Sequence, residues 1–149
     1  MRSAILLDVE RSYEVKTSAG KYWNYFNPNP RNSTKASDCT IRAVCAVTDL
    51  SWYEVFDKLV ALARENCTIP NSKSIRADRM KLFNLKKITL PKVKRGGKRP
   101  TVEDWCKQHP TGKYILGVSK HEVGVVNGKY YDTWRSGDYS VYSAWELEA

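Results

Sequence analysis

The chain has 149 residues, of which 42% are apolar, and this is enough material for one core of ordinary size. We therefore expect a single domain over residues 1–149. The net charge of +9 favours acidic partners. The apolar run at residues 4–7 is soon followed by charged residues, so we expect neither a secretory signal nor a membrane partner, and a cytoplasmic protein.

Four cysteines are present, at Cys39, Cys45, Cys67 and Cys106. A chain of this size does not need disulfides, so we expect free thiols. The spacings contain no C-x-x-C pair and the chain has only two histidines, so the sequence predicts no metal site. Nothing in it indicates an organic cofactor. The oligomeric state stays open.

The first elements are expected to be extended. Residues 4–26 mix β-branched and aromatic side chains around a break at residues 18–20, which suggests a short hairpin or two edge strands. Residues 27–31, with the sequence NPNPR, are predicted to form a turn.

Helices are expected next. Ser37 or Asp38 can cap a short helix that begins at Cys39 and has one apolar face. Ser51 and Glu54 form a capping-box pattern, and the apolar residues after it recur at helical spacing.

Two further helices are predicted before the chain becomes extended again. A weaker helical pattern covers residues 76–83. Another helix is capped by Thr101 and stops at Pro110 and Gly112, because neither residue continues a helix readily.

The last third of the chain has the alternation of strands. We expect strands at residues 114–116, 122–126, 129–134 and 139–145. The dipeptide Asn127-Gly128 predicts a two-residue hairpin turn, since both residues tolerate positive φ. Helices followed by an antiparallel sheet give an α+β fold.

The hairpin places two chemically interesting side chains together. A two-residue turn pairs position 126 with 129, so that Val123 faces Asp132 and His121 faces Trp134. His121 and Asp132 are then diagonal neighbours on one face, about 7–8 Å apart at the backbone. The sequence thus predicts a His–Asp contact, with Trp134 shielding it from water.

Cys39 is the candidate on which this histidine would act. Free N–H groups and the helix dipole stabilise a thiolate at the first turn of a helix. Cys45 falls on the apolar face and is expected in the core, whereas Cys67 and Cys106 have no neighbouring base in the sequence. We therefore predict Cys39 as nucleophile, His121 as general base and Asp132 as the residue that orients the histidine.

The sequences SDCTIRA at residues 37–43, SWYE at 51–54 and HEVGVVNGKYYDTW at 121–134 resemble small cysteine peptidase-like proteins of bacteria and their phages, within the papain-like superfamily. The resemblance covers residues 22–145. It implies a helical part carrying Cys39, packed on an antiparallel sheet carrying His121 and Asp132, with a substrate cleft between them. It also implies hydrolysis of a peptide or isopeptide bond in a bacterial or phage-infected cell.

The chain departs from the papain-like pattern before the nucleophile. Such enzymes usually place a glutamine there to help form the oxyanion hole, but residues 29–38 read NPRNSTKASD. We expect Asn32 or Ser33 to substitute, together with the backbone N–H of Cys39. Asp38 and Trp134 are expected to line the cleft.

Other functions fit the same residues. An identical triad supports acyl transfer, because the cleft decides which nucleophile accepts the acyl group. The basic residues 86–87 and 92–99, the latter with Gly96-Gly97, predict a solvated loop, but they also suit an acidic substrate, nucleic acid or a host protein. An inactive relative that blocks a host protein is a further alternative.

Overall fold

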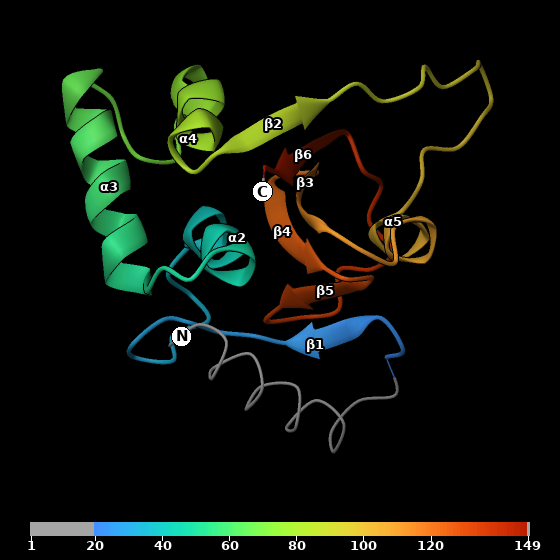
Figure 1. The fold of residues 1–149 in the computed structure, drawn as a ribbon, viewed down its shortest axis with the longest axis horizontal. Coiled ribbons are helices and arrows are strands. Elements are labelled where there is room, and N and C mark those ends of the chain that lie inside the picture. The colour runs from blue at the N-terminus through green and yellow to red at the C-terminus, as the bar shows by residue number, and fades with distance from the viewer. Residues whose placement is uncertain (1–19, 149) are drawn as a thin grey trace.

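The computed structural model describes residues 20–148, so residues 4–19 of the hairpin or edge strands expected over residues 4–26 lie outside them. The described part is an α+β fold with four α-helices and a six-stranded sheet in the order β1-β5-β4-β3-β6-β2 (Figure 1). No helix in this part is long and apolar enough to cross a membrane. The strands are β1 Trp23–Tyr25, β2 Leu85–Ile88, β3 Lys113–Val118, β4 His121–Val126, β5 Lys129–Asp132 and β6 Ser143–Leu147.

Helices cover both faces of the sheet. One apolar cluster joins α2 (Cys39–Val47), α3 (Trp52–Glu65) and α4 (Arg76–Leu82) to side chains such as Ile115 on one face. A second cluster joins α5 (Val102–Gln108) to the alternate side chains of β3 and β4, such as Leu116 and Val123, which point to the opposite face of the sheet. Alternation along the strands therefore divides the core between two helical layers.

Local capping explains where the helices begin. Ser51 Oγ accepts a hydrogen bond from the N–H of Glu54 at 3.2 Å at the start of α3. Thr101 and Asp104 form both bonds of a capping box at the start of α5. The predicted beginnings of these helices and of α2 are confirmed. A 3₁₀ turn, η1 (Lys73–Ile75), precedes α4.

The hairpin register is also confirmed. Val126 pairs with Lys129, and Gly124 pairs with Tyr131. Asn127 and Gly128 both have positive φ, at 48° and 78°, as a two-residue hairpin turn requires.

The expectation of a purely antiparallel sheet is wrong at one edge. β1 pairs with β5 in parallel, with Trp23 opposite Tyr130, so the sheet is mixed. β1 reaches this position because the N–H of Tyr130 donates to the carbonyl of Tyr22 and the N–H of Phe26 donates to that of Asp132.

The strands also differ from the prediction in other places, most clearly at β2, β5 and β6. β2 was not expected, because its exposed lysines hide the alternation, yet it forms the edge beside β6. β5 ends at Asp132 and not at residue 134. β6 begins at Ser143 and not at residue 139, because residues 139–141 instead bond to the backbone before and at the start of α5, through Val102 N to Tyr139 O and Val141 N to Pro100 O.

Gly124 allows α2 to approach β4 closely. A Cβ at this position would lie 2.7 Å from Ala46 Cβ and 3.0 Å from the carbonyl oxygen of Ala43. The small residues on both sides set the separation of helix and strand, and thereby bring Cys39 to the beginning of β4.

Candidate active site

Cys39 is the first residue of α2 and its thiol is partly exposed. The first backbone bond of the helix runs from Arg42 N to Asp38 O, at 2.9 Å. The N–H groups of residues 39–41 therefore have no partner within the helix. The thiol is hydrogen-bonded to the His121 side chain and to the backbone N–H of Glu122.

His121 begins β4 and Asp132 ends β5. His121 Nε2 lies 2.6 Å from Asp132 Oδ2, so the contact expected from the hairpin register is present. Since Nε2 faces the carboxylate, Nδ1 is the ring nitrogen left to bond with Cys39. The three side chains thus form one chain of hydrogen bonds from sulfur to carboxylate.

The Asp132 carboxylate is itself held in place. Ser136 Oγ donates to Oδ2 at 2.6 Å, and the N–H of Thr133 donates to Oδ1 at 2.8 Å. The indole N–H of Trp23 donates to the Asp132 carbonyl at 3.1 Å. Only 2% of Asp132 is exposed, so the Ser136 and Thr133 donors replace water at the carboxylate, while Trp23 satisfies the backbone carbonyl.

Arg42 connects the helix that begins at Cys39 to this carboxylate. Its Nη1 lies 2.9 Å from Asp38 Oδ1, and its Nη2 lies 3.7 Å from Asp132 Oδ1. Sequence analysis missed Arg42, although a signal existed: it is the only charged residue in the otherwise apolar or small helix CTIRAVCAV. A buried cation in such a helix needs buried anionic partners.

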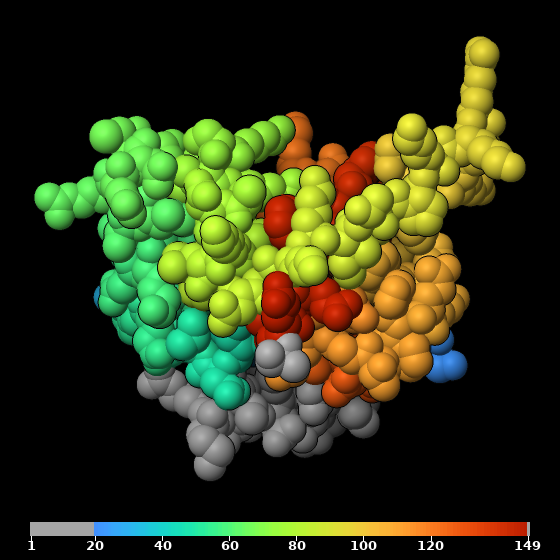
Figure 2. All heavy atoms as spheres, turned by 45° about the horizontal axis from the view of Figure 1, so that its top comes forward, coloured from blue at the N-terminus to red at the C-terminus, as the bar shows by residue number. Residues whose placement is uncertain are grey.

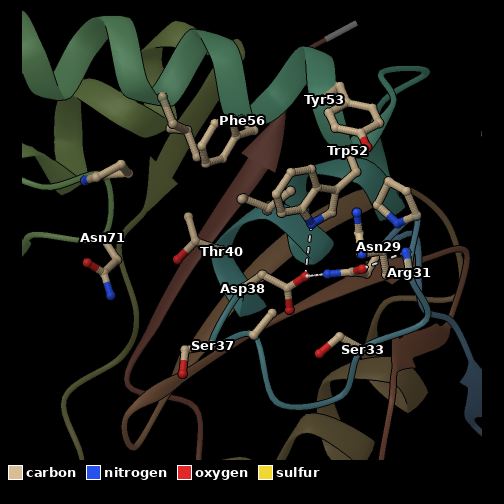
Figure 3. A pocket seen from close by; sticks show the side chains of 15 residues that line it. Asn29, Arg31, Ser33, Ser37, Asp38, Thr40, Trp52, Tyr53, Phe56 and Asn71 are labelled. Atoms are coloured by element: carbon tan, nitrogen blue, oxygen red, sulfur yellow. Dashed lines mark hydrogen bonds between the residues drawn. The ribbon is translucent and has the colours of Figure 1, made fainter.

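Asp38 is buried, and its carboxylate bonds to several neighbouring side chains besides Arg42. Its Oδ2 accepts from the indole N–H of Trp52 at 2.9 Å and from Asn29 Nδ2 at 3.1 Å (Figure 3). It makes no side-chain capping bond, so it leaves the first N–H groups of α2 open. Asn29, which sequence analysis also missed, fixes the segment before the nucleophile.

A cavity of about 620 Å³ lies beside this network, between residues 29–41 and α3. Asp38 and Thr40 line it, on either side of Cys39 in the sequence, and Trp52 and Phe56 stack on its other wall with ring centroids 5.0 Å apart (Figure 3). The cavity is therefore an apolar space next to the start of the helix that carries the thiol.

The predicted oxyanion residues occupy the loop before α2. Ser33 lines the cavity, and its hydroxyl accepts from Lys35 N at 3.2 Å. Asn32 is exposed with φ 54°, and its N–H donates to Asn29 O. Their role as oxyanion donors stays a prediction.

Trp134 covers the histidine from the turn after β5. Its ring centroid lies 5.0 Å from that of His121, with 39° between the planes. Trp134 is 38% exposed, so it forms the outer wall of the His–Asp pair, as expected, although it does not belong to the strand.

The electrostatics of Cys39 and His121 favour an ion pair. Burial raises the pKa of the Cys39 thiol, but hydrogen bonds from His121 and Glu122 N–H, with the charge of His121, outweigh it and hold this pKa below its ordinary value. Burial lowers the pKa of His121, but its bonds to Asp132 and Cys39 and their negative charges raise it to about 9. The imidazolium is therefore the favoured form of His121 at neutral pH, and the Cys39 thiolate is stabilised relative to that of an ordinary cysteine.

The other three thiols lack this environment. All four cysteines are free, as predicted. Burial raises the pKa of Cys45 and of Cys106 to about 12, so both are inert core residues at neutral pH. Cys67 is exposed just beyond the end of α3.

Glu122 joins the thiol to a second polar cluster. Its buried carboxylate lies 3.3 Å from Arg76 Nε and 3.6 Å from Arg79 Nη2. Arg76 Nη2 also donates to Ser143 Oγ at 2.7 Å. Two guanidinium groups share one carboxylate, so the cluster adds one positive charge beside Cys39.

Comparison with protein-family models, curated proteins and solved structures finds no match to this chain. Among residues 20–148, no group of three or more His, Cys, Asp or Glu side chains is arranged to hold a metal ion.

Proposed function

We propose that the chain is a papain-like cysteine hydrolase that cleaves a peptide or isopeptide bond through a thioester on Cys39. The supporting observation is the continuous chain of hydrogen bonds from the Cys39 thiol through His121 to Asp132. The partial exposure of the thiol and its lowered pKa add to this support, since a nucleophile must be both ionised and reachable.

In the first step the Cys39 thiolate attacks the substrate carbonyl carbon and forms a C–S bond. The carbonyl oxygen becomes an oxyanion, for which the backbone N–H of Cys39 is a donor. The imidazolium of His121 then gives its Nδ1 proton to the leaving nitrogen, the C–N bond breaks and the amine departs.

In the second step water hydrolyses the thioester. Neutral His121 takes a proton from water as the oxygen attacks the thioester carbon. The C–S bond breaks, the acid product leaves and the thiolate–imidazolium pair is restored. Asp132 holds the ring orientation and stabilises the imidazolium in both steps.

The test is acyl-enzyme formation with a small neutral active ester, followed by intact-mass spectrometry. We expect a burst of leaving group and one acyl group on Cys39, and we expect neither with Cys39→Ala. His121→Ala should lower the acylation rate by a factor of about 10²–10⁴ with the fold intact, because it removes general acid–base catalysis.

Cys67→Ser is the matched control, since it removes an exposed thiol far along the sequence from the site. It should leave the burst unchanged. Acylation of Cys67 in the wild type, or an unchanged rate in His121→Ala, would contradict the proposal. Adding a primary amine separates the two reaction types, because an acyltransferase would give the amide in preference to the acid.

A further inference from the structure

A groove of about 660 Å³ lies at the end of β2 and the beginning of β6. It is lined by residues 87–93, Arg99, Tyr142 and Ser143, and we call it the basic groove. Every charged residue in this lining is a cation, namely Lys87, Lys92 and Arg99. In Figure 2 the yellow segment that contains residues 89–100 lies on the surface, with red atoms of the last part of the chain beside it.

The basic groove is connected to the proposed nucleophile by three successive contacts. Ser143, in its wall, accepts from Arg76 Nη2 at 2.7 Å. Arg76 contacts the carboxylate of Glu122, and the N–H of Glu122 bonds to the Cys39 thiol. Only the side chains of Arg76 and Glu122 therefore separate Ser143, in the groove wall, from the Cys39 thiol.

Positive charge exceeds negative charge along this whole path. Arg76 and Arg79 share the single carboxylate of Glu122, and the Arg76 side chain is 33% exposed. A neighbouring hollow of about 850 Å³ shares Lys92 and Arg99 with the groove and contains further lysines. Its one carboxylate, Asp104, is occupied by a bond from Thr101 N.

A cation lies near each of two aromatic rings in this region. The Arg99 guanidinium lies 4.6 Å from the centroid of the Tyr142 ring, and Lys87 Nζ lies 5.7 Å from that of Trp145. These contacts restrain the cations and occupy ring faces on which nucleic acid bases would stack. The groove thus offers three cations but only one aromatic ring, Tyr142, and that ring already has a cation beside it, which favours carboxylates over nucleotides.

We propose that the basic groove binds an acidic segment of the substrate, a few residues from the bond that Cys39 attacks. This inference rests on the proposed function and adds the substrate class to it: a peptide or protein with Asp or Glu side chains on one side of the scissile bond. Electrostatic attraction along the groove would also raise the rate of encounter.

Binding is tested with the Cys39→Ala protein, which keeps the groove and prevents turnover. Fluorescence anisotropy is measured with a labelled Glu-Ala repeat peptide, with the Gln-Ala peptide of equal length and with single-stranded DNA of equal net charge. We expect the Glu peptide to bind at least about tenfold more tightly than either competitor, and its affinity to fall as salt is added.

The groove is tested by charge reversal at Lys92 and Arg99 together. We expect Lys92→Glu/Arg99→Glu to weaken binding of the Glu peptide by about tenfold or more. Lys58→Glu/Lys129→Glu is the matched control, because it changes the net charge equally at exposed positions outside the groove. It should weaken binding much less.

Several results would overturn the inference. Tighter binding of the DNA would make the groove a nucleic-acid site, and equal weakening by both double variants would reduce the effect to net charge. If the neutral active ester still acylates Cys39 of the wild-type protein in these cases, the proposed hydrolase function is supported and only the proposed acidic substrate is rejected. If the Glu peptide binds but no ester acylates Cys39, the hydrolase fails and the groove loses its role in substrate binding.

Discussion

Arg42 Nη2 lies 3.7 Å from Asp132 Oδ1, which connects helix α2, beginning at Cys39, to strand β5, ending at Asp132. The same guanidinium bonds to Asp38, immediately before Cys39. Both carboxylates are buried, so Arg42 compensates two charges at once and fixes the first turn of α2 against β5.

Replacing Arg42 tests this connection. We expect Arg42→Met to lower the free energy of unfolding by about 3–5 kcal/mol, because it leaves buried carboxylates without their cation. Denaturant unfolding measures the loss, and Arg64→Met, at an exposed position on α3, is the control. If both variants are equally stable, the Arg42 contacts contribute nothing.

Arg42→Lys tests whether Arg42 positions the Cys39 site in addition to stabilising the fold. Lysine keeps the charge but lacks the planar fork that spans both carboxylates. We expect the folded variant to require a higher pH for alkylation of Cys39 than the wild type. An unchanged pH profile would restrict Arg42 to a structural role.

Asp132→Asn should move two titrations in opposite directions. Loss of the carboxylate charge lowers the pKa of His121 from about 9, since that charge is one of the causes that raise it. With less imidazolium beside it, the Cys39 thiol needs a higher pH to ionise. NMR of the His121 ring protons and the pH profile of alkylation measure the two shifts, and a His121 titration that stays near 9 would exclude Asp132 as the cause.

Alkylation should also distinguish the four thiols. At a pH below 7, iodoacetamide is expected to label Cys39 before Cys67, although Cys67 is the more exposed residue, because the Cys39 thiol lies beside His121 and has a lowered pKa. Cys45 and Cys106 should react only after unfolding. Peptide-level mass spectrometry gives the rates, and faster labelling of Cys67 would argue against an activated thiolate.

The ion pair should make stability depend on pH in a defined direction. The folded pKa of His121, about 9, exceeds its ordinary value of 6.5, so the stabilisation is complete below about pH 6.5 and is lost as pH rises through about 9. The difference in unfolding free energy between wild type and His121→Gln should therefore shrink over that interval. A constant difference would show that proton binding at His121 is not coupled to folding.

Gly124→Ala should disturb the site without touching a polar group. The added methyl would meet Ala46 and the Ala43 carbonyl, so α2 must move away from β4 at a cost of about 1–3 kcal/mol. Slower alkylation of Cys39, beside a lower denaturant midpoint, would follow from the shifted helix. Ser119→Ala, at an exposed turn, should change neither quantity.

Features encoded within a short stretch of chain were predictable from sequence. The caps at Ser51 and Thr101 place two helices, because each cap and its partner lie within one turn. The Asn127-Gly128 turn sets the hairpin register, and from that register follows the His121–Asp132 contact. The proximity of Cys39 to this pair was inferred only from the order of elements and a family resemblance.

Contacts between distant segments were decided by the tertiary structure. The parallel pairing of β1 with β5, the edge strand β2 and the Arg42–Asp132 ion pair join residues far apart in the chain, and no local pattern states which partner each will find. Sequence alone determined a cysteine at the start of a helix, a His–Asp hairpin and an excess of positive charge. Packing decided which buried charges meet and brought a cationic groove into contact with the cluster beside Cys39, because close-packed cores select partners by shape and charge together.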